Sequence, residues 1–162
     1  MSAPGQWLQG GEAVAWRSFI TAAGRLLQRL DGELAASCRL SLAEYEILVL
    51  LNEAGDWGMR MTALAGAVLM SPSGLTRRVD RLVADGLVER RTCPTDRRGV
   101  LGVLTPAGRA RLEAAAPIHV AGVRRWFLDP LDDRQLEVLA EALAKVADRT
   151  AEVPADARPA DG

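Results

Sequence analysis

The sequence predicts a mainly α-helical (α+β) fold, in which long helical regions at both ends of the chain enclose two short helices and a β-hairpin. Three observations predict it. Apolar residues recur at helical spacing near the N-terminus, capping residues mark the starts of the central helices, and a polar, arginine-rich tip separates two short apolar segments. The 162 residues are enough for one domain.

The composition, 49% hydrophobic and 25% charged, is that of a globular protein. No apolar stretch is long enough to span a membrane, and residues 1–10 lack the basic start of a secretory signal. We therefore expect a cytoplasmic protein without a membrane partner. Two distant cysteines, Cys38 and Cys93, and one histidine, His119, are too few for a disulfide framework or a zinc site, so no cofactor is expected.

The basic residues concentrate in the middle of the chain. Between Arg60 and Arg111 there are ten arginines and four acidic residues, a net charge of +6, although the whole chain carries −1. A basic centre with acidic ends is typical of a nucleic-acid-binding surface, but an ordinary solvated surface explains the charge equally well. The charge alone therefore does not decide the function.

A long helix is predicted from about Glu12 to Cys38, after a flexible N-terminus over residues 1–11. An apolar stripe of this length buries against its own domain or against a partner subunit. The stripe consists of Trp16, Ile20, Ala23, Leu27, Leu30 and Leu34, widened by Phe19 and Leu26.

The next helix is predicted to begin at Ser41, because Ser41 and Glu44 have the spacing of a capping box. Its apolar positions continue to Leu51, and Gly55 is expected to end it.

Two short helices joined by a tight turn are predicted next. Thr62 is expected to cap a helix over residues 63–69. Ser71 is expected to cap the second helix, with Pro72 at its first position, where the missing N–H costs nothing. That helix is predicted to end before Gly86.

A β-hairpin is predicted from strands over residues 87–92 and 99–104, around a polar tip over residues 93–98. Helices over residues 106–128 and 133–149 follow, and residues 151–162 are expected to form a disordered tail.

The helix from Ser73 to Asp85 carries the most functional information. One face is apolar and the other presents hydroxyls and arginines near the N-terminal end, as a DNA-recognition helix does. A solvated amphipathic helix is the simpler interpretation of this segment by itself, but the capped helix before it and the basic hairpin after it favour recognition. The apolar face holds Leu75, Val79, Leu82 and Val83, and the polar face holds Ser73, Thr76, Arg77, Asp80 and Arg81.

The hairpin tip offers a second contact with DNA. Arg97 and Arg98 are expected to place a guanidinium in the minor groove, where A·T-rich tracts concentrate negative potential. Asp96 is expected to pair with a nearby arginine and stiffen the loop, since phosphate charge would repel it.

These segments resemble the multiple-antibiotic-resistance regulator (MarR) family. Asp96-Arg97-Arg98-Gly99 through Leu104-Thr105-Pro106-Ala107-Gly108 matches the family's wing signature, D-x-R, five residues, then L-T-x-x-G. Ser71 to Leu82, followed by Asp85 to Arg90, is similar to the family's recognition helix and its exit into the wing, and a looser similarity covers about residues 14–147. The chain departs from the usual pattern at Cys93-Pro94 and Gly102.

The resemblance implies a winged helix-turn-helix over residues 41–105 and dimerisation helices over residues 12–40 and 106–150, within a single domain over residues 12–150. It implies that Ser73, Thr76 and Arg77 contact the major groove, that Arg98 enters the minor groove, and that Asp96 orients the wing. The expected function is that of a non-enzymatic, DNA-binding transcriptional repressor, which binds a pseudo-palindromic operator as a homodimer and is released by a small-molecule effector. The full set of expected DNA contacts is Ser71, Ser73, Thr76, Arg77, Arg81, Arg97 and Arg98.

Sensing is predicted less directly. The family implies a small aromatic or anionic effector, and the candidates to line its cleft are Trp16, Phe19, Tyr45, His119 and Arg124. A plain core or interface role is the simpler interpretation of each of them. Thiol-based redox sensing through Cys93 is an alternative, because Arg90, Arg91, Arg97 and Arg98 would favour its thiolate; Cys38 is expected to be buried.

An enzyme and a protein-binding module are the two other function classes for a chain of this kind. The chain holds no nucleophile, phosphate-loop or metalloprotease motif, which argues against an enzyme. A winged helix that binds protein instead of DNA stays open, because the fold does not oblige DNA contact.

Overall fold

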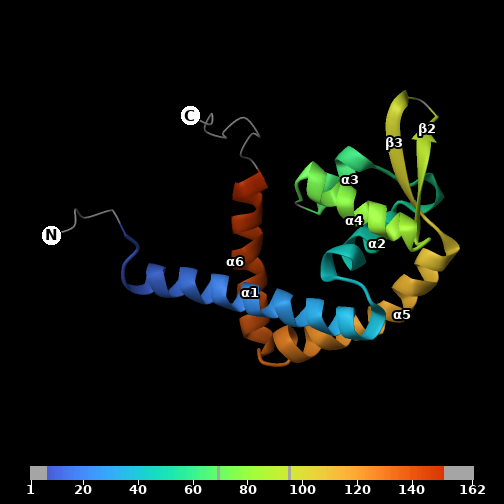
Figure 1. The fold of residues 1–162 in the computed structure, drawn as a ribbon. Coiled ribbons are helices and arrows are strands. Elements are labelled where there is room, and N and C mark those ends of the chain that lie inside the picture. The colour runs from blue at the N-terminus through green and yellow to red at the C-terminus, as the bar shows by residue number, and fades with distance from the viewer. Residues whose placement is uncertain (1–6, 69, 95, 152–162) are drawn as a thin grey trace. The chain divides into compact units, whose positions relative to one another are not determined.

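The computed structural model describes residues 7–68, 70–94 and 96–151, and the side chains of Arg97 and Arg98 lie outside its description. The chain forms two compact units, one ending at Gly122 and the other beginning at Val123. The first holds the predicted helix-turn-helix and hairpin (Figure 1). The predicted tail falls on residues 152–162, outside the described part of the chain.

Helix α1 (Gly10–Cys38) begins two residues before the predicted start and ends as predicted. Its C-terminal half is packed, with Leu30 and Leu34 buried. Its N-terminal half is not, because Trp16 and Ile20 on the same stripe are exposed. The predicted stripe therefore divides into a part that joins the core of the first unit and a part that this unit does not cover.

Helix α2 (Leu42–Glu53) begins with the predicted capping box. The Ser41 hydroxyl accepts a hydrogen bond from the Glu44 backbone N–H at 3.2 Å, and the Glu44 carboxylate accepts from the Ser41 N–H at 2.8 Å. These bonds satisfy N–H groups that have no partner inside a helix. Gly55, at a φ of +64°, follows the end of α2 and starts the short 3-10 helix η1 (Gly55–Trp57).

Helix α3 (Met61–Ala67) corrects the prediction that Thr62 is its cap. Thr62 lies inside the helix, and the capping position belongs to Arg60, whose side chain makes no capping hydrogen bond. Helix α4 (Pro72–Ala84) follows the prediction, because the Ser71 hydroxyl accepts from the Gly74 N–H at 3.2 Å and Pro72 occupies the first turn.

The sheet has three antiparallel strands in the order β1-β3-β2. Strands β2 (Val88–Cys93) and β3 (Asp96–Leu104) form the predicted hairpin, but both extend further toward the tip than expected, since Cys93 and Asp96 are register partners. In Figure 1 the pair projects as a finger beyond α3 and α4. Strand β1 (Met59–Arg60), which pairs with the outer edge of β3, was not predicted.

Gly58 allows β1 to lie against β3. Its φ is +70°, a conformation that costs glycine little, and a Cβ built there would stand 2.3 Å from the Gly102 carbonyl oxygen. Any other residue at this position would push the short strand off the sheet.

The predicted C-terminal helices are present with one change. Helix α5 (Pro106–Val123) passes into a π-helix, η2 (Arg124–Leu128), where a continuous α-helix was expected. Helix α6 (Asp133–Ala151) completes the second unit. Among the described residues, no helix combines the length and the apolar character that crossing a bilayer requires.

The core of the first unit lies where α1, α2, α3, α4 and the sheet meet. Its centre is aliphatic, so it is held by burial of branched side chains at close packing. The largest fully buried side chains are Leu34, Leu40, Ile47, Leu48, Leu51, Leu64, Leu75, Leu82, Val79 and Val88.

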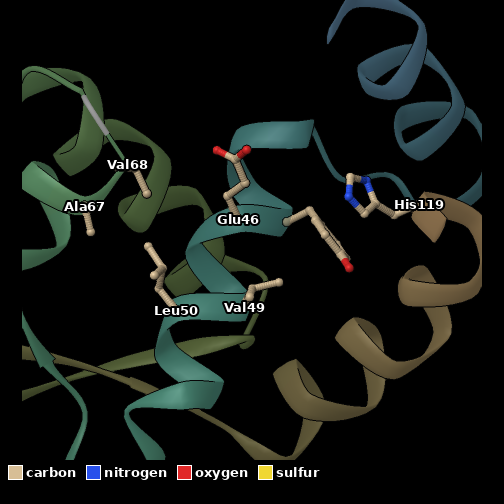
Figure 2. Close-up of a pocket in the computed structure, with 7 residues that line it drawn as sticks. Glu46, Val49, Leu50, Ala67, Val68 and His119 are labelled. Carbon is tan, nitrogen blue, oxygen red and sulfur yellow. The ribbon is translucent and has the colours of Figure 1, made fainter. Parts of the chain in front are cut away.

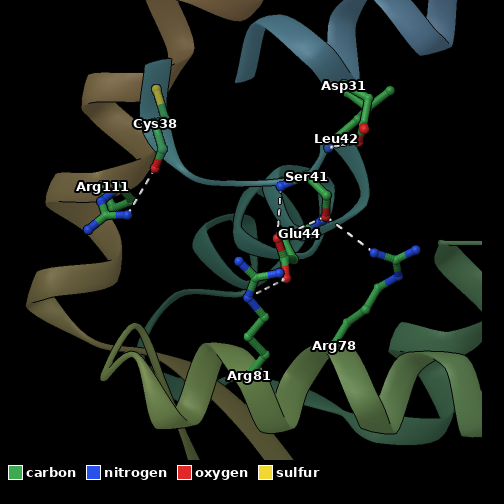
Figure 3. Close-up of polar contacts among 8 residues, drawn as sticks. All are labelled: Asp31, Cys38, Ser41, Leu42, Glu44, Arg78, Arg81 and Arg111. Carbon is green, nitrogen blue, oxygen red and sulfur yellow. Dashed lines mark hydrogen bonds and ion pairs between the residues drawn. The ribbon is translucent and has the colours of Figure 1, made fainter. Parts of the chain in front are cut away.

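Residues 38–44, here called the α1–α2 corner, are bonded to two other helices (Figure 3). The Leu42 N–H donates to the Asp31 carboxylate on α1 at 2.8 Å. The Arg111 guanidinium on α5 donates to the Cys38 carbonyl oxygen at 3.0 Å. The corner is therefore fixed to α1 and α5 by backbone groups that the helices leave unpaired.

The same corner also holds α4 (Figure 3). The Arg81 Nε lies 3.5 Å from a carboxylate oxygen of Glu44, whose side chain is only 3% exposed. The Arg78 guanidinium donates to the Ser41 hydroxyl at 3.2 Å. Two arginines on successive turns of α4 thus bind the capping box of α2, and the buried Glu44 carboxylate serves both elements.

We predict that Glu44→Gln lowers the free energy of unfolding by about 1–3 kcal/mol, because an amide group presents N–H donors to the donors of Ser41 or Arg81 inside a buried site. Urea denaturation at a fixed protein concentration measures this change. Glu46→Gln, an exposed position on the same helix, is the control and should stay within about 0.5 kcal/mol of the parent. Equal effects of the two substitutions would contradict the structural role of Glu44.

Candidate nucleic-acid interface

Helix α4 divides into the two predicted faces. Leu75, Val79 and Leu82 are buried in the core of the first unit. The polar face lies opposite the packed apolar face and is therefore open to solvent. Its exposed members are Ser73, Thr76, Arg77, Asp80 and Arg81, as predicted.

The hydroxyl groups at the start of α4 have local partners. Ser71 and Ser73 place their hydroxyl oxygens 3.3 Å apart, and Thr76 donates to the Pro72 carbonyl oxygen at 2.9 Å. Each hydroxyl oxygen has two lone pairs besides its one donor, so acceptor capacity is left for an outside group. These side chains are held in defined positions at the exposed end of the helix.

The three arginines of α4 differ in their surroundings. Arg78 and Arg81 are bonded to the α1–α2 corner, although the Arg81 side chain remains 62% exposed. Within the described part of the chain, Arg77 makes no side-chain hydrogen bond or ion pair. Together with Gly74 and Glu44 they line a hollow of about 320 Å³. Three guanidinium groups around one carboxylate leave this hollow positively charged.

Two acidic residues of the basic segment, Asp80 and Glu89, form ion pairs with its arginines. Asp80 on α4 accepts from Arg90 on β2 at 2.5 Å, and Glu89 pairs with Arg91 within β2. The first of these pairs joins α4 to the hairpin directly. Part of the positive charge counted in the sequence is therefore structural, and Arg77 is the exposed arginine of α4 that no such pair holds.

The hairpin carries the other predicted contacts. Arg97 and Arg98 belong to β3 by their backbone, and the positions of their side chains are outside the description. Asp96, at the start of β3, accepts a hydrogen bond from Arg60 on β1 at 2.9 Å. The predicted pairing of Asp96 with an arginine is present, and Arg60, which provides it, is a residue that the sequence did not single out for this role.

A pocket of about 450 Å³ lies against α2 (Figure 2). The rings of Tyr45 and His119 line it with their centroids 4.6 Å apart. Burial lowers the pKa of His119, and the nearby Glu46 carboxylate opposes that shift. Burial also raises the pKa of Tyr45. The remaining lining residues, which the sequence did not single out, are Glu46, Val49, Leu50, Ala67 and Val68.

The structure brings together two of the five predicted effector residues and not the other three. Tyr45 and His119 share the pocket, whereas Trp16 lies on the exposed part of α1 beside Phe19, at a ring separation of 6.3 Å, and does not line it. Arg124 lies in the second unit, whose position relative to this pocket is undefined. Apart from Glu46, the missed residues are aliphatic, and nothing in their spacing separates pocket lining from core.

The two cysteines are both buried. Cys38 lies at the end of α1, as expected. Cys93 is only 7% exposed, and its sulfur accepts a hydrogen bond from Arg60 at 3.5 Å. The redox hypothesis required an accessible thiol, so this burial counts against it.

Comparisons with known proteins agree with this geometry. The MarR family model matches residues 40–100. The HTH-type transcriptional repressor YetL of Bacillus subtilis is 31% identical over 111 residues, which cover 67% of this chain and 66% of YetL, just under two thirds of it.

Two solved structures are similar over most of their length. The MarR family regulator Sco3205 from Streptomyces coelicolor, solved in complex with DNA, is 36% identical with a TM-score of 0.86, covering 94% of this chain and 98% of that one. CouR from Rhodococcus jostii RHA1, solved bound to p-coumaroyl-CoA, is 26% identical with a TM-score of 0.73, covering 86% and 96%.

These relatives confirm the fold class and the expectation of a regulator instead of an enzyme. In this chain the shared fold presents a helix with one buried and one exposed polar face, followed by a two-stranded hairpin. The chain belongs to the MarR family of transcriptional regulators.

Proposed function

We propose that this protein is a sequence-specific transcriptional repressor that binds a pseudo-palindromic DNA operator as a homodimer and releases it when a small molecule binds. The observation that carries the proposal is the exposed polar face of α4, on a helix whose other face is locked in the core. Sco3205, which shares the fold over nearly its whole length, was solved with DNA. YetL is a named repressor.

In this proposal α4 reads the major groove. Arg77 supplies a planar fork that matches the O6 and N7 acceptors of guanine, and Ser73 and Thr76 supply hydroxyls at the N-terminal end of the helix. Ser71 and Arg81 lie at the edges of the same face and are assigned to backbone phosphates. The hairpin contributes Arg97 and Arg98 in the adjoining minor groove.

The homodimer is supported by the uncovered part of α1. Contiguous exposed apolar surface on a globular protein marks an interaction site. A second copy of the chain is its simplest occupant, and a two-fold axis would set the two α4 helices about 34–36 Å apart, one turn of B-form DNA. The exposed apolar residues are Val14, Trp16, Phe19, Ile20 and Leu27.

The pocket at Tyr45 and His119 is the proposed effector site. It combines an apolar wall with two neighbouring rings whose planes are tilted by 34°, and such a lining suits a planar aromatic compound. Ala67 and Val68, at the C-terminal end of α3, belong to its lining and lie close in sequence to the start of α4. A ligand that binds more tightly when α3 is displaced would lower the affinity for DNA. The coupling free energy is reciprocal, so bound DNA would lower the affinity for the ligand by the same amount.

A protein-interaction module without DNA binding is the alternative function. It predicts that binding to any duplex lacks a steep salt dependence, whereas a regulator that neutralises several phosphates loses affinity steeply as salt rises. Selection of bound sequences from a random duplex pool at a stated salt concentration distinguishes the two and yields the operator.

We predict that Arg77→Ala weakens binding to the selected operator by about 1–3 kcal/mol and relaxes base preference at one position in each half-site. Fluorescence anisotropy at constant salt measures the change. Arg109→Ala removes the same charge from α5, where Arg109 bonds Asn52, and should have the smaller effect. Unaltered affinity and base preference in Arg77→Ala would remove α4 from direct readout.

We predict that Ile20→Glu converts the dimer to a monomer, because it places a charge in the apolar interface. Sedimentation equilibrium gives the mass. Trp57→Glu is the control, since Trp57 is 85% exposed on η1, away from α1 in sequence and element, and it should stay dimeric. A dimeric Ile20→Glu protein would contradict the assignment of this face.

We predict that the protein loses stability as the pH falls below about 6.5, the ordinary histidine pKa, because the lowered pKa of His119 makes the unfolded chain bind the proton first. Stability from this group is complete above that pH and declines as the pH falls toward the folded-state pKa. Denaturation across this range should show a shallower decline for His119→Phe, which retains ring packing on Tyr45. Identical slopes in the two proteins would contradict it.

A further inference from the structure

We propose that Arg60 is a positioning residue for DNA binding. It connects the start of α3 to both strands of the hairpin and so fixes the orientation of the hairpin relative to α4. This inference rests on the proposed function, because it concerns how the hairpin reaches DNA. Arg60 itself is not assigned a contact with DNA.

The Arg60 guanidinium bonds to both strands at their distal ends. Its Nη1 donates to the Asp96 carboxylate at 2.9 Å, and its Nη2 donates to the Cys93 sulfur at 3.5 Å. Cys93 is the last residue of β2 and Asp96 is the first of β3, and the two are register partners. One side chain thus closes the hairpin from outside, through the two arms of its fork.

The sheet leaves room for this side chain. Arg60 pairs with Leu101 in the β1–β3 register, so it enters from the edge of β3. A Cβ built on Gly99 would stand 2.9 Å from the Arg60 Nη1 and 3.1 Å from the Cys93 Cβ. The missing side chain at Gly99 therefore leaves room for the guanidinium to cross β3 and reach Cys93 on β2.

Arginine is a poor residue for the place that Arg60 occupies in α3. It is the N-cap residue, where Ser, Thr, Asp or Asn would bond a free N–H, and its side chain makes no such bond. Its positive charge also lies at the positive end of the helix dipole. Local helix stability therefore does not explain this arginine, whereas its contacts with the hairpin do.

The contacts are also too exposed to matter mainly for stability. The side chains of Arg60 and Asp96 are 44% and 43% exposed, and ion pairs at such positions contribute little to folding. Their effect is to restrict where the hairpin points. A hairpin that is already oriented loses less conformational entropy when it docks, and this entropy is recovered as affinity.

The test uses Arg60→Ser, which removes the fork and installs a good N-cap. Thermal unfolding should show equal or higher stability than the parent. Affinity is measured at constant salt on the duplex selected by the parent, in two versions with A·T or G·C pairs in the flanks. We expect the preference for A·T flanks to fall about threefold to tenfold, the cost of ordering a loop on binding, with preference for the central bases unchanged.

Two further variants make the result specific. Arg98→Ala removes the proposed minor-groove contact, and adding Arg60→Ser to it should cause no further loss of flank preference, because Arg60 acts through the hairpin. Arg109→Ser loses the same charge elsewhere on the unit and should keep the flank preference. Arg60→Lys keeps the charge but lacks the planar fork, and should resemble Arg60→Ser.

The inference is overturned if Arg60→Ser behaves like Arg109→Ser, or if its effect adds fully to that of Arg98→Ala, which would mean that Arg60 touches DNA itself. A parent protein that selects no duplex sequence would instead refute the proposed function, and this inference with it. A parent that selects an operator but is indifferent to its flanks would leave the function standing and refute the role of Arg60.

Discussion

The packing of one face of α4 fixes where its other face points, and the proposed reading of DNA depends on that constraint. Leu75, Val79 and Leu82 are buried without a gap in a core of branched aliphatic side chains, so the helix cannot rotate about its axis without exposing them. The bonds from Arg78 and Arg81 to the α1–α2 corner prevent it from sliding along its axis as well. Because rotation and sliding are both restricted, the exposed face of the helix presents Ser73, Thr76 and Arg77 in fixed positions relative to one another.

Some arginines of the basic segment have a structural role, and the others stay available for DNA. Arg60, Arg81 and Arg90 each bind a carboxylate on another element, and so connect β1 to β3, α4 to α2, and β2 to α4. Arginine suits this use because its planar fork reaches across an interface and keeps its charge. The net charge of +6 already subtracts Asp80, Glu89 and Asp96, so these pairs do not lower it further. They concentrate the positive charge that DNA would meet on fewer arginine side chains.

The long apolar stripe of α1 also serves two purposes. Its C-terminal part, with Leu30 and Leu34, belongs to the core of the first unit, where a Cβ on Gly122 of α5 would stand only 2.8 Å from the Leu30 side chain. Its N-terminal part has no cover within that unit. One continuous helix could in this way transmit a change at the proposed subunit interface to the corner that carries Ser41 and Glu44, because both ends belong to the same element.

The sequence by itself determined the features that depend on local chemistry. The capping box at Ser41 and Glu44, the cap at Ser71 and the two faces of α4 follow from hydrogen bonds and periodicity within a few residues, and the structure has all of them. The wing signature identified the family for the same reason, since its spacing is local. The hairpin was predicted in kind, although its strands run closer to the tip than alternation indicated.

Only the tertiary structure decided the features in which distant residues meet. Strand β1 has two residues, too few for a pattern, and exists because β3 is there to pair with it; that pairing also gave the cap of α3 to Arg60 and not to Thr62. The partner of Asp96, the burial of Cys93 and the pocket behind Tyr45 all require elements separated by many residues to come together. Sequence periodicity reports which face of a segment is apolar, but what covers that face is set by the packing of the whole unit.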